Sequence, residues 1–238
     1  FLKPKTRVSV EDLIRGIIVQ SGNDACIVVA ESLSGSEPVF ALEMNEKARE
    51  LDMTQSHFVN STGWPHPEHR MSPRDLAILS QRLIQDFPEY YHYFKELEFT
   101  YNGIKQRNRN PLLYKEMNAD GLKTGHTKES GYGLVASVSR HDRRIVLVIN
   151  GLPSKKARSA EPERLFEWAY REYSNYYLLK SGELLQMVSG RMQVIAYEHG
   201  IRENSPLPGV IQRICAVKNL ELSSREDGDP PNCSLELK

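Results

Sequence analysis

The first part of the chain alternates apolar stretches of helical period with short polar joints. Ser9 is typical of an N-cap and starts the first predicted helix, whose apolar positions are Leu13, Ile14, Ile17 and Ile18. A second helix, capped by Asn23 or Asp24, ends near Gly35. The polar joint Ser21-Gly22-Asn23 is therefore expected at a tight turn between two buried helices.

Two further helices are predicted before the pattern changes. Ser36 caps the third helix, with Pro38 in its first turn, and Ser72 followed by Pro73 starts the fourth. Between them, residues 55–71 contain two prolines, a glycine and three histidines. This composition predicts an irregular loop.

The pattern becomes alternating near Phe99. Phe99 and Tyr101 alternate with polar residues up to Asn102-Gly103, and this dipeptide is a strong hairpin signal. Residues 105–120 show neither the helical nor the alternating pattern of apolar residues, and we expect them to form a loop over the surface.

Two apolar segments, Tyr132–Val138 and Arg144–Ile149, flank a turn at His141-Asp142 and predict an antiparallel pair. The segment Lys123-Thr124-Gly125 lies just before them, and we expect it to lead into or along the first strand. A long helix follows over Ala160–Tyr177, and its expected inward positions are Leu165, Trp168, Ala169 and Tyr173.

The order of these elements predicts an α/β domain of the layered α+β type, with an antiparallel sheet and packing helices. We expect this domain to occupy residues 1–177. Residues 178–238 show no clean strand alternation after Met187 and are expected to be a partial or diverged C-terminal segment. Its polar stretch Ser223–Asn232 is expected to be disordered.

Composition narrows the range of functions. The 238 residues are 26% charged, and 31 basic residues balance 31 acidic ones. The lack of a basic excess argues against binding of nucleic acid. No window approaches the roughly 20 apolar residues of a membrane span. The three cysteines are too widely spaced to suggest a disulfide framework or a zinc site, and they are Cys26, Cys215 and Cys233.

No metal or organic cofactor is indicated. The segment His66-Pro67-Glu68-His69 contains two candidate ligands for a metal ion. Pro65 and Pro67 forbid the regular helix that would place both histidines on one face. We therefore expect a plain polar loop at this point.

Two short motifs carry the candidate chemistry. Ser21-Gly22-Asn23 lies at a helix joint, and Lys123-Thr124-Gly125 lies beside a strand about a hundred residues later. Each alone is a weak signal, because three-residue matches arise by chance and a Ser-Gly-Asn turn is also a good structural linker. Together they are more specific, since apolar helices surround the first motif and a hairpin follows the second.

With these motifs the chain resembles the serine D,D-peptidases, the penicillin-binding proteins of the low-molecular-mass carboxypeptidase type. The resemblance runs over residues 1–177 and includes the phrases Leu13–Gly16, Gln20–Ala25, Ser72–Leu76, Phe99–Gly103 and Asp120–Thr127. It implies the β-lactamase/D,D-peptidase transpeptidase-like fold. It also implies acyl transfer from a peptidoglycan pentapeptide that ends in D-Ala-D-Ala, with β-lactam antibiotics as acylating inhibitors.

The resemblance implies catalytic roles for three residues. Ser21 matches a hydroxyl that relays protons to the leaving amine. Asn23 matches an asparagine whose side chain holds the substrate backbone amide. Lys123 supplies positive charge to the relay and to the terminal carboxylate of the substrate.

Five further residues match substrate-binding positions of that family. Thr124 offers its hydroxyl to the carboxylate, and Gly125 keeps the strand edge clear for the substrate backbone. The backbone N–H of His126 matches one of the two oxyanion donors. Arg109 and Arg158 match arginines beside the cleft.

The chain departs from the family pattern at the nucleophile. The first motif of the family is Ser-x-x-Lys, which provides the attacking serine and its lysine base. No serine of the chain has a lysine three positions later. We expect this motif, with the first helix and the first strands of the sheet, to lie before Phe1. The fold would then be N-terminally incomplete and the chain by itself inactive.

Three hypotheses about function follow. The first is a serine-type D-Ala-D-Ala carboxypeptidase at the periplasmic face of the bacterial inner membrane, attached through a C-terminal anchor absent from these residues. The second is a non-catalytic remnant that binds peptidoglycan or penicillin. The third is a β-lactamase-like hydrolase, which is disfavoured by Gly22, where one class of those enzymes carries aspartate.

Overall fold

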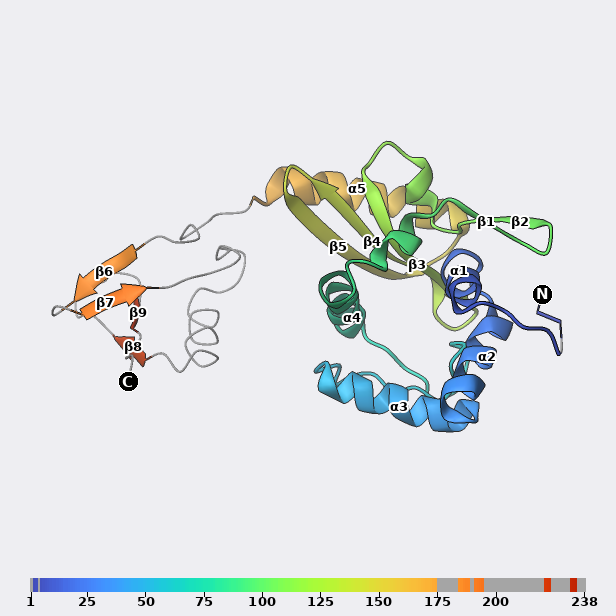
Figure 1. Cartoon of the computed structure of the whole chain (residues 1–238). Coiled ribbons are helices and arrows are strands. Elements are labelled where there is room, and N and C mark those ends of the chain that lie inside the picture. The colour runs from blue at the N-terminus through green and yellow to red at the C-terminus, as the bar shows by residue number, and fades with distance from the viewer. Residues whose placement is uncertain are drawn as a thin grey trace. The chain divides into compact units, whose positions relative to one another are not determined.

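The computed structural model describes residues 2–3 and 5–174, and beyond them the backbone of four short strands. The chain divides into two compact units, Phe1–Ala169 and Tyr170–Lys238. The first unit contains the helices and the sheet that position both motifs (Figure 1). The expected domain boundary after residue 177 lies outside the described residues.

Three helices open the first unit, as the sequence pattern predicts. Helix α1 spans Val10–Gln20, helix α2 spans Asn23–Ser34 and helix α3 spans Glu37–Glu50. The predicted serine caps of α1 and α3 are confirmed. In α1, the Ser9 Oγ atom accepts a hydrogen bond from the N–H of Asp12 at 3.0 Å.

The predicted cap of α2 is wrong. Gly22 is the N-cap residue, and Asn23 is already the first residue of the helix. The Asp24 carboxylate instead accepts hydrogen bonds from the backbone N–H groups of Ala25 and Leu2, both at 3.0 Å. The joint is therefore closed by a glycine and not by a polar side chain.

Helix α4 spans Pro73–Asp86 and is capped by Ser72, as predicted. Residues 55–71 form the expected irregular loop. His57 and Arg70 close this loop through a pair of backbone hydrogen bonds of 2.8 and 2.9 Å.

No single helix of the described residues is long and apolar enough to span a membrane. The pair α2 and α3 meets the same length and composition criteria only when both are taken together, and the two are bent by 84° at the break between them.

The predicted hairpin is confirmed. Strand β1 spans Glu98–Tyr101 and pairs antiparallel with β2, Ile104–Arg107. Asn102 and Gly103 make the turn with φ of 50° and 75°, a conformation that asparagine and glycine tolerate best.

The expected loop over residues 105–120 is wrong at both ends. Strand β2 continues to Arg107, and strand β3 begins at Ala119. A short 3-10 helix, η2 (Pro111–Tyr114), lies between them, and η1 (Tyr91–Lys95) packs against β3. This part of the chain is therefore ordered by its contacts with the sheet.

The central sheet has three antiparallel strands in the order β3, β4, β5. Strand β3 spans Ala119–Thr127, β4 spans Gly131–Arg140 and β5 spans Arg143–Leu152. The predicted pair of strands is thus confirmed, with longer bounds. His141 and Asp142 form its turn with φ of 48° and 59°.

The segment Lys123-Thr124-Gly125 belongs to a strand of its own, which leads into the first predicted strand, as one of the two expectations had it, and does not run along it. It lies within β3, opposite Val135, Leu134 and Gly133 of β4. Within the described sheet, β3 has a neighbouring strand on one side only. The motif therefore lies on a sheet edge.

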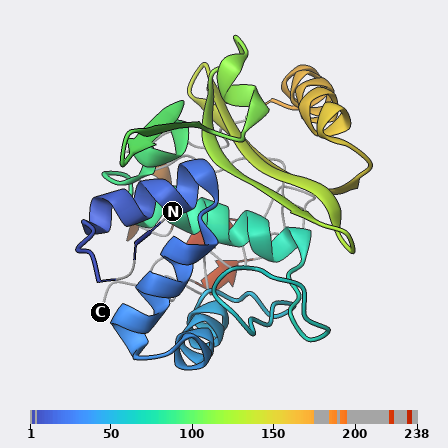
Figure 2. The same ribbon diagram turned by 90° about the vertical axis from the view of Figure 1, so that its right-hand side faces the viewer.

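Two helical layers enclose the sheet. Helix α5 (Lys155–Glu172) covers one face, and α4 lies against the other, as both views show (Figures 1 and 2). Residues 133–138 of β4 are all buried. A middle strand covered on both faces is expected to be buried in this way.

Helix α5 differs from the prediction in its bounds and in its buried face. It spans Lys155–Glu172 instead of Ala160–Tyr177. The predicted inward residues Trp168 and Tyr173 are 42% and 46% exposed. The buried side chains are instead spaced four apart, and they are Arg158, Pro162 and Phe166.

Beyond the last residues of α5 and residues 173–174, the described part of the second unit consists of four short strands. They are β6 (Leu184–Val188), β7 (Arg191–Val194), β8 (Glu221–Ser223) and β9 (Asn232–Ser234). Strand β6 pairs with β7, and β8 pairs with β9, both antiparallel. Strands β7, β8 and β9 lie in the stretch after Met187, where the sequence shows no clean strand alternation. The stretch predicted to be disordered lies outside the described residues except at its ends, where Ser223 pairs with Asn232.

Candidate active site

The tertiary structure joins the two motifs through a hydrogen bond. The Lys123 Nζ atom donates to Ser21 Oγ at 2.9 Å, across 102 residues of chain. The same ammonium donates to the backbone oxygen of Thr124 at 3.0 Å. A lysine in contact with a serine hydroxyl is the arrangement that a proton relay needs.

Ser21 is held in a left-handed backbone conformation, with φ of 61° and ψ of 47°. Its N–H donates to the Ile17 oxygen at 3.1 Å, and the N–H of Gly22 donates to the Gly16 oxygen at 3.0 Å. A Cβ on Gly22 would lie only 3.2 Å from that Gly16 oxygen. The close joint between α1 and α2 therefore favours glycine at this position and fixes the direction of the Ser21 side chain.

Lys123 lies in a partly buried and cationic environment. Burial, followed by the charges of Arg109 and Arg158, lowers the pKa of Lys123 to about 8. The charge on Cys26, when its thiol is ionised, acts in the opposite direction. A lysine with this pKa changes protonation state close to neutral pH, as a residue of a proton relay must.

Arg158 lies in the first turns of α5 and is 9% exposed. Its Nη1 donates to the Gly125 oxygen at 3.4 Å, and its guanidinium lies 5.4 Å from the centre of the Tyr132 ring. Its Nε is buried without a hydrogen-bond partner in the described structure. A buried donor without a partner is uncommon.

Arg109 is exposed between two buried asparagines. Asn108 Nδ2 donates to the Glu96 oxygen, and Asn110 Nδ2 donates to the Gly121 oxygen, both at 2.9 Å. These bonds attach the loop to the segment before β1 and to β3. They hold Arg109 at a defined place beside the sheet edge.

Three cations of the site have no carboxylate partner in the part of the chain that the structure describes. Arg109, Lys123 and Arg158 are close enough that Arg109 lowers the pKa of each of the other two. Among residues 5–174, none of the three forms an ion pair with a carboxylate. A cluster of uncompensated positive charge favours a bound anion such as a carboxylate.

The other predicted site residues lie on α2, close to Ser21, and on β3, close to Lys123. Asn23 is the first residue of α2, two positions from Ser21. On β3, Thr124 is 8% exposed, and the His126 ring lies 4.0 Å from the Tyr132 ring. No atom of the described structure lies within 4 Å of a Cβ built on Gly125. The packing of the chain therefore does not itself require glycine at this position.

Sequence reasoning missed two residues at the site. Cys26, which had no expected role at the site, is half-buried one helical turn after Asn23 and interacts electrostatically with Lys123, while burial raises the pKa of its thiol. Tyr132 contacts both His126 and Arg158. The helical spacing could have revealed Cys26, whereas Tyr132 required the register between β3 and β4.

In the histidine-rich loop, ring nitrogens of two histidines accept hydrogen bonds from nearby backbone N–H groups. His66 Nδ1 accepts from the N–H of Glu68 at 3.2 Å, and His69 Nδ1 accepts from the N–H of Val59 at 3.3 Å. Among the described residues, no group of three or more histidine, cysteine, aspartate or glutamate side chains is placed to hold a metal ion.

Comparison with known sequences gives one consistent result. Residues 1–154 match the family described as D-alanyl-D-alanine carboxypeptidase. The chain is 42% identical over 184 residues to D-alanyl-D-alanine carboxypeptidase DacD of Salmonella typhimurium, covering 77% of this chain and 47% of that protein. It is 45% identical over 172 residues to DacC of Escherichia coli, covering 72% and 43%. The chain thus spans about half the length of the curated relatives it matches.

Comparison with solved structures agrees. Penicillin binding protein 5 from Haemophilus influenzae matches with a TM-score of 0.77 and 37% identity, over 82% of this chain and 59% of that one. Penicillin-binding protein D2 from Listeria monocytogenes, in its cefotaxime-bound form, matches with a TM-score of 0.64 and 30% identity, over 70% and 69%. These similarities confirm the predicted fold class.

Proposed function

The chain belongs to the D-alanyl-D-alanine carboxypeptidase family, and from this premise we propose that it forms the carboxylate-recognising wall of a serine-type D-Ala-D-Ala carboxypeptidase. The substrate class is the peptidoglycan stem peptide. The compartment is the bacterial cell envelope outside the inner membrane, and the relatives named above are all bacterial.

The observation that supports this proposal most directly is the uncompensated cation cluster. Arg109, Lys123 and Arg158 lie near one another at the Lys-Thr-Gly edge without a carboxylate partner in the described residues. The terminal carboxylate of a D-Ala-D-Ala peptide supplies the missing negative charge. Arg158 adds its positive charge to this cluster.

The remaining residues have roles along the same edge. Ser21 and Lys123 pass a proton to the amine of the departing D-alanine, and their 2.9 Å hydrogen bond provides the path. The Asn23 side chain and the backbone N–H of His126 hold the carbonyl and amide groups of the substrate. Thr124 donates its hydroxyl to the terminal carboxylate.

The acyl-transfer step needs a nucleophile besides these residues. In the proposed reaction a serine oxygen bonds to the penultimate carbonyl carbon, the amide bond to D-alanine breaks, and water later cleaves the ester. No serine of the 238 residues has a lysine three positions later. We therefore propose that these residues by themselves bind the substrate and do not become acylated.

β-Lactams are proposed as a second class of ligand. Their carboxylate presents the same charge as the terminal carboxylate of the peptide. The Listeria monocytogenes relative, 30% identical to this chain, has been solved in cefotaxime-bound and ampicillin-bound forms. A β-lactam would thus occupy the same edge of β3.

Two measurements on the chain test this proposal. Intact mass after incubation with excess benzylpenicillin is expected to show no adduct, and a single stoichiometric adduct would overturn the assignment of a missing nucleophile.

An NMR titration with acetyl-D-Ala-D-Ala is expected to show saturable binding. The variant Lys123→Ala is expected to weaken this binding at least about ten-fold, because it loses one charge-assisted contact. Lys105→Ala is the matched control, because Lys105 pairs with Glu98 on the hairpin. No binding, or equal loss in both variants, would contradict the proposed recognition. Turnover of benzylpenicillin would favour the β-lactamase alternative.

A further inference from the structure

Strand β3 pairs with β4 in two registers, which meet at Asp120. Residues 121–127 pair in continuous register with residues 131–137 of β4, and Lys123 lies opposite Val135. Before them, Ala119 lies opposite Val138. Asp120 is thus one extra residue of β3 without a partner on β4, which is the arrangement of a β-bulge.

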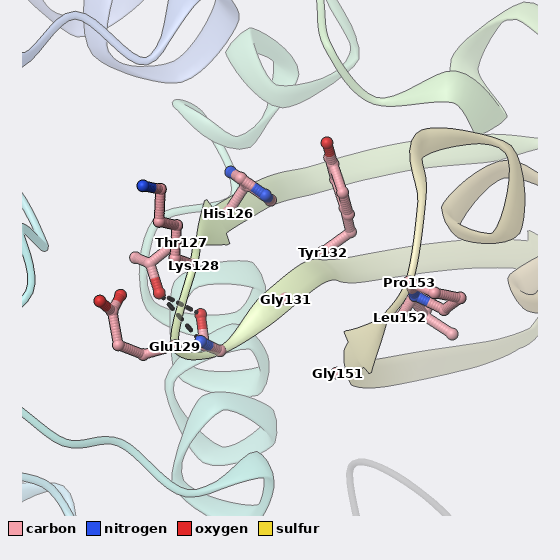
Figure 3. A pocket seen from close by; sticks show the side chains of 10 residues that line it. His126, Thr127, Lys128, Glu129, Gly131, Tyr132, Gly151, Leu152 and Pro153 are labelled. Carbon is pink, nitrogen blue, oxygen red and sulfur yellow. Dashed lines mark hydrogen bonds between the residues drawn. The ribbon is translucent and has the colours of Figure 1, made fainter.

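The register after the bulge is set by the turn into β4. The hydroxyls of Thr127 and Ser130 lie 2.8 Å apart, and the Ser130 N–H donates to Thr127 Oγ1 at 3.0 Å. Figure 3 shows this turn beside a pocket of about 400 Å³ that His126 and Tyr132 also line. The turn holds the Lys-Thr-Gly edge in its register only as long as the bulge stays before Lys123.

The place of the bulge decides on which face of the sheet Lys123 lies. Adjacent residues of a strand point to opposite faces, so a change of register by one residue turns a side chain to the other face. If the extra residue lay after Lys123, the lysine would lie opposite Leu134, the present partner of Thr124. Its ammonium would then point away from the Ser21 hydroxyl, which it now contacts at 2.9 Å.

The Asp120 carboxylate is held from two other elements. Arg144 of β5 donates from Nη1 to Asp120 Oδ1 at 2.8 Å and lies 2.7 Å from Oδ2. Tyr91 of η1 donates its hydroxyl to Asp120 Oδ1 at 3.2 Å. Burial, followed by the charge of Asp120, raises the pKa of Tyr91, so this hydroxyl keeps its proton. Arg144 Nη1 also donates to the hydroxyl of Ser137, a fully buried residue of β4.

Gly121 favours the same placement of the bulge. A Cβ on Gly121 would lie only 2.7 Å from the Tyr91 hydroxyl oxygen and 3.3 Å from Phe94 Cβ. If the bulge moved along β3, Asp120 would take the place of Gly121 opposite Ser137, where its side chain would meet Tyr91. The packing of η1 on β3 therefore opposes a shift of the extra residue toward Lys123.

We propose that Asp120 is a positioning residue for Lys123. Held by Arg144 and Tyr91, Asp120 confines the bulge to one place in β3, and the bulge keeps Lys123 on the face that meets Ser21. In this role Asp120 acts through Lys123 and not on the substrate. The consequence for substrate binding rests on the proposed function, whereas the contact between Lys123 and Ser21 does not.

Asp120→Ala tests this role through the pKa of Lys123, measured without ligand by NMR titration of the lysine Cε signals and assigned with Lys123→Met. In the unmodified chain, burial, followed by the charges of Arg109 and Arg158, lowers this pKa to about 8. Release of the bulge takes Lys123 out of this environment, so its pKa is expected to rise to about 9 or above. Loss of the Asp120 charge alone would lower the pKa of a lysine, so a rise identifies a displaced ammonium.

A second variant and a control accompany this measurement. Asp120→Asn keeps the shape and an oxygen acceptor for Tyr91 but loses the charge that binds Arg144, and a smaller rise is expected. It also provides the result if Asp120→Ala does not fold. Glu167→Ala removes a carboxylate that pairs with Arg140 of β4 at 2.7 Å. This control is expected to leave the pKa of Lys123 unchanged.

The outcomes separate the positioning role from the proposed function. An unchanged or lower pKa of Lys123 in the Asp120 variants, or an equal rise in Glu167→Ala, would overturn the positioning role and leave the proposed function standing. The affinity of Asp120→Ala for acetyl-D-Ala-D-Ala is expected to fall about ten-fold, as for Lys123→Ala. If the unmodified chain did not bind this peptide, the proposed function would fail, while a rise in the pKa would still support the positioning role.

Discussion

Lys123 Nζ and Ser21 Oγ form a hydrogen bond of 2.9 Å between β3 and the joint of α1 and α2. The bond depends on the backbone at Ser21, which has the left-handed conformation that residues other than glycine rarely adopt. The side-chain contact therefore requires a backbone conformation that is itself unfavourable. We propose that this conformation is kept because it holds the Ser21 hydroxyl against the Lys123 ammonium.

Ser21→Gly is expected to separate these two effects. Glycine relieves the left-handed strain, which amounts to about 1 kcal/mol, and removes the hydroxyl. We expect Ser21→Gly to be more stable than Ser21→Ala by about that amount, as measured by urea denaturation. Both variants should lose the relay equally. Equal stability of the two variants would show that the position carries no strain.

The pH dependence of ligand binding is expected to follow Lys123. Its lowered pKa of about 8 means that the free site holds the ammonium below pH 8 and loses it above. A bound carboxylate favours the charged form and raises this pKa in the complex. Affinity for acetyl-D-Ala-D-Ala is therefore expected to be greatest below pH 8 and to fall as pH rises through it, in titrations from pH 6 to 10.

Lys123→Met serves as the control for this prediction. It keeps the volume of the stem without the titrating amine, so the fall in affinity around pH 8 should disappear. Arg109, Arg158 and the Cys26 thiol remain nearby in this variant. The arginines stay charged over this pH range. If the variant kept the same pH profile as the unmodified chain, the Cys26 thiol and not Lys123 would be responsible.

Gly125→Ala is expected to weaken binding without destabilising the fold. The structure has no atom within 4 Å of the added Cβ, so the unfolding midpoint should change little. A peptide paired with the edge of β3 would meet the methyl group, and we expect its affinity to fall about ten-fold or more.

Gly133→Ala is the matched control on β4, directly opposite Gly125. There the added Cβ would lie 2.5 Å from Asn150 Oδ1, so the Asn150 side chain must move. The expected result is some loss of stability with retained affinity. The reverse pattern in the two variants would contradict the placement of the peptide along β3.

Asn110→Ala is expected to destabilise the chain by about 1–3 kcal/mol, because it leaves the buried Gly121 oxygen without its donor. It also frees the loop that carries Arg109. Urea denaturation measures the effect. The control variant is Gln55→Ala, which truncates an exposed amide. A change within about 0.5 kcal/mol, as is usual for surface positions, would show that the bond is not structural.

The helical half of the fold could be predicted from the sequence because its signals are local. Ser9, Ser36 and Ser72 cap helices within three residues of their own position, and Asn102-Gly103 forms its turn through its own backbone preferences. The pattern failed where a residue's conformation depends on distant partners. Strand β3 has few apolar residues, and its conformation is stabilised by pairing with β4.

The bounds and the buried face of helix α5 also depend on contacts that the sequence pattern does not show. Pro162 is typical of a first helical turn, yet the helix begins at Lys155, because Ser154 accepts from the N–H of Ala157 at 3.1 Å. The face that becomes buried is the one that meets the sheet, and it includes Arg158. A charged residue in the buried stripe is invisible to a hydrophobic pattern, since its burial is compensated by contacts with Gly125 and Tyr132.

The sequence by itself determined the family and named the residues of the candidate site, because both motifs are contiguous and their residue types are tied to one chemistry. The tertiary structure alone decided how they meet. It placed the Lys123 ammonium on the Ser21 hydroxyl, left Arg109, Lys123 and Arg158 without a counter-ion in the described residues, and opened a pocket beyond His126. These features depend on distances between segments far apart in the chain, and such distances are set by packing and strand register, which no local pattern encodes.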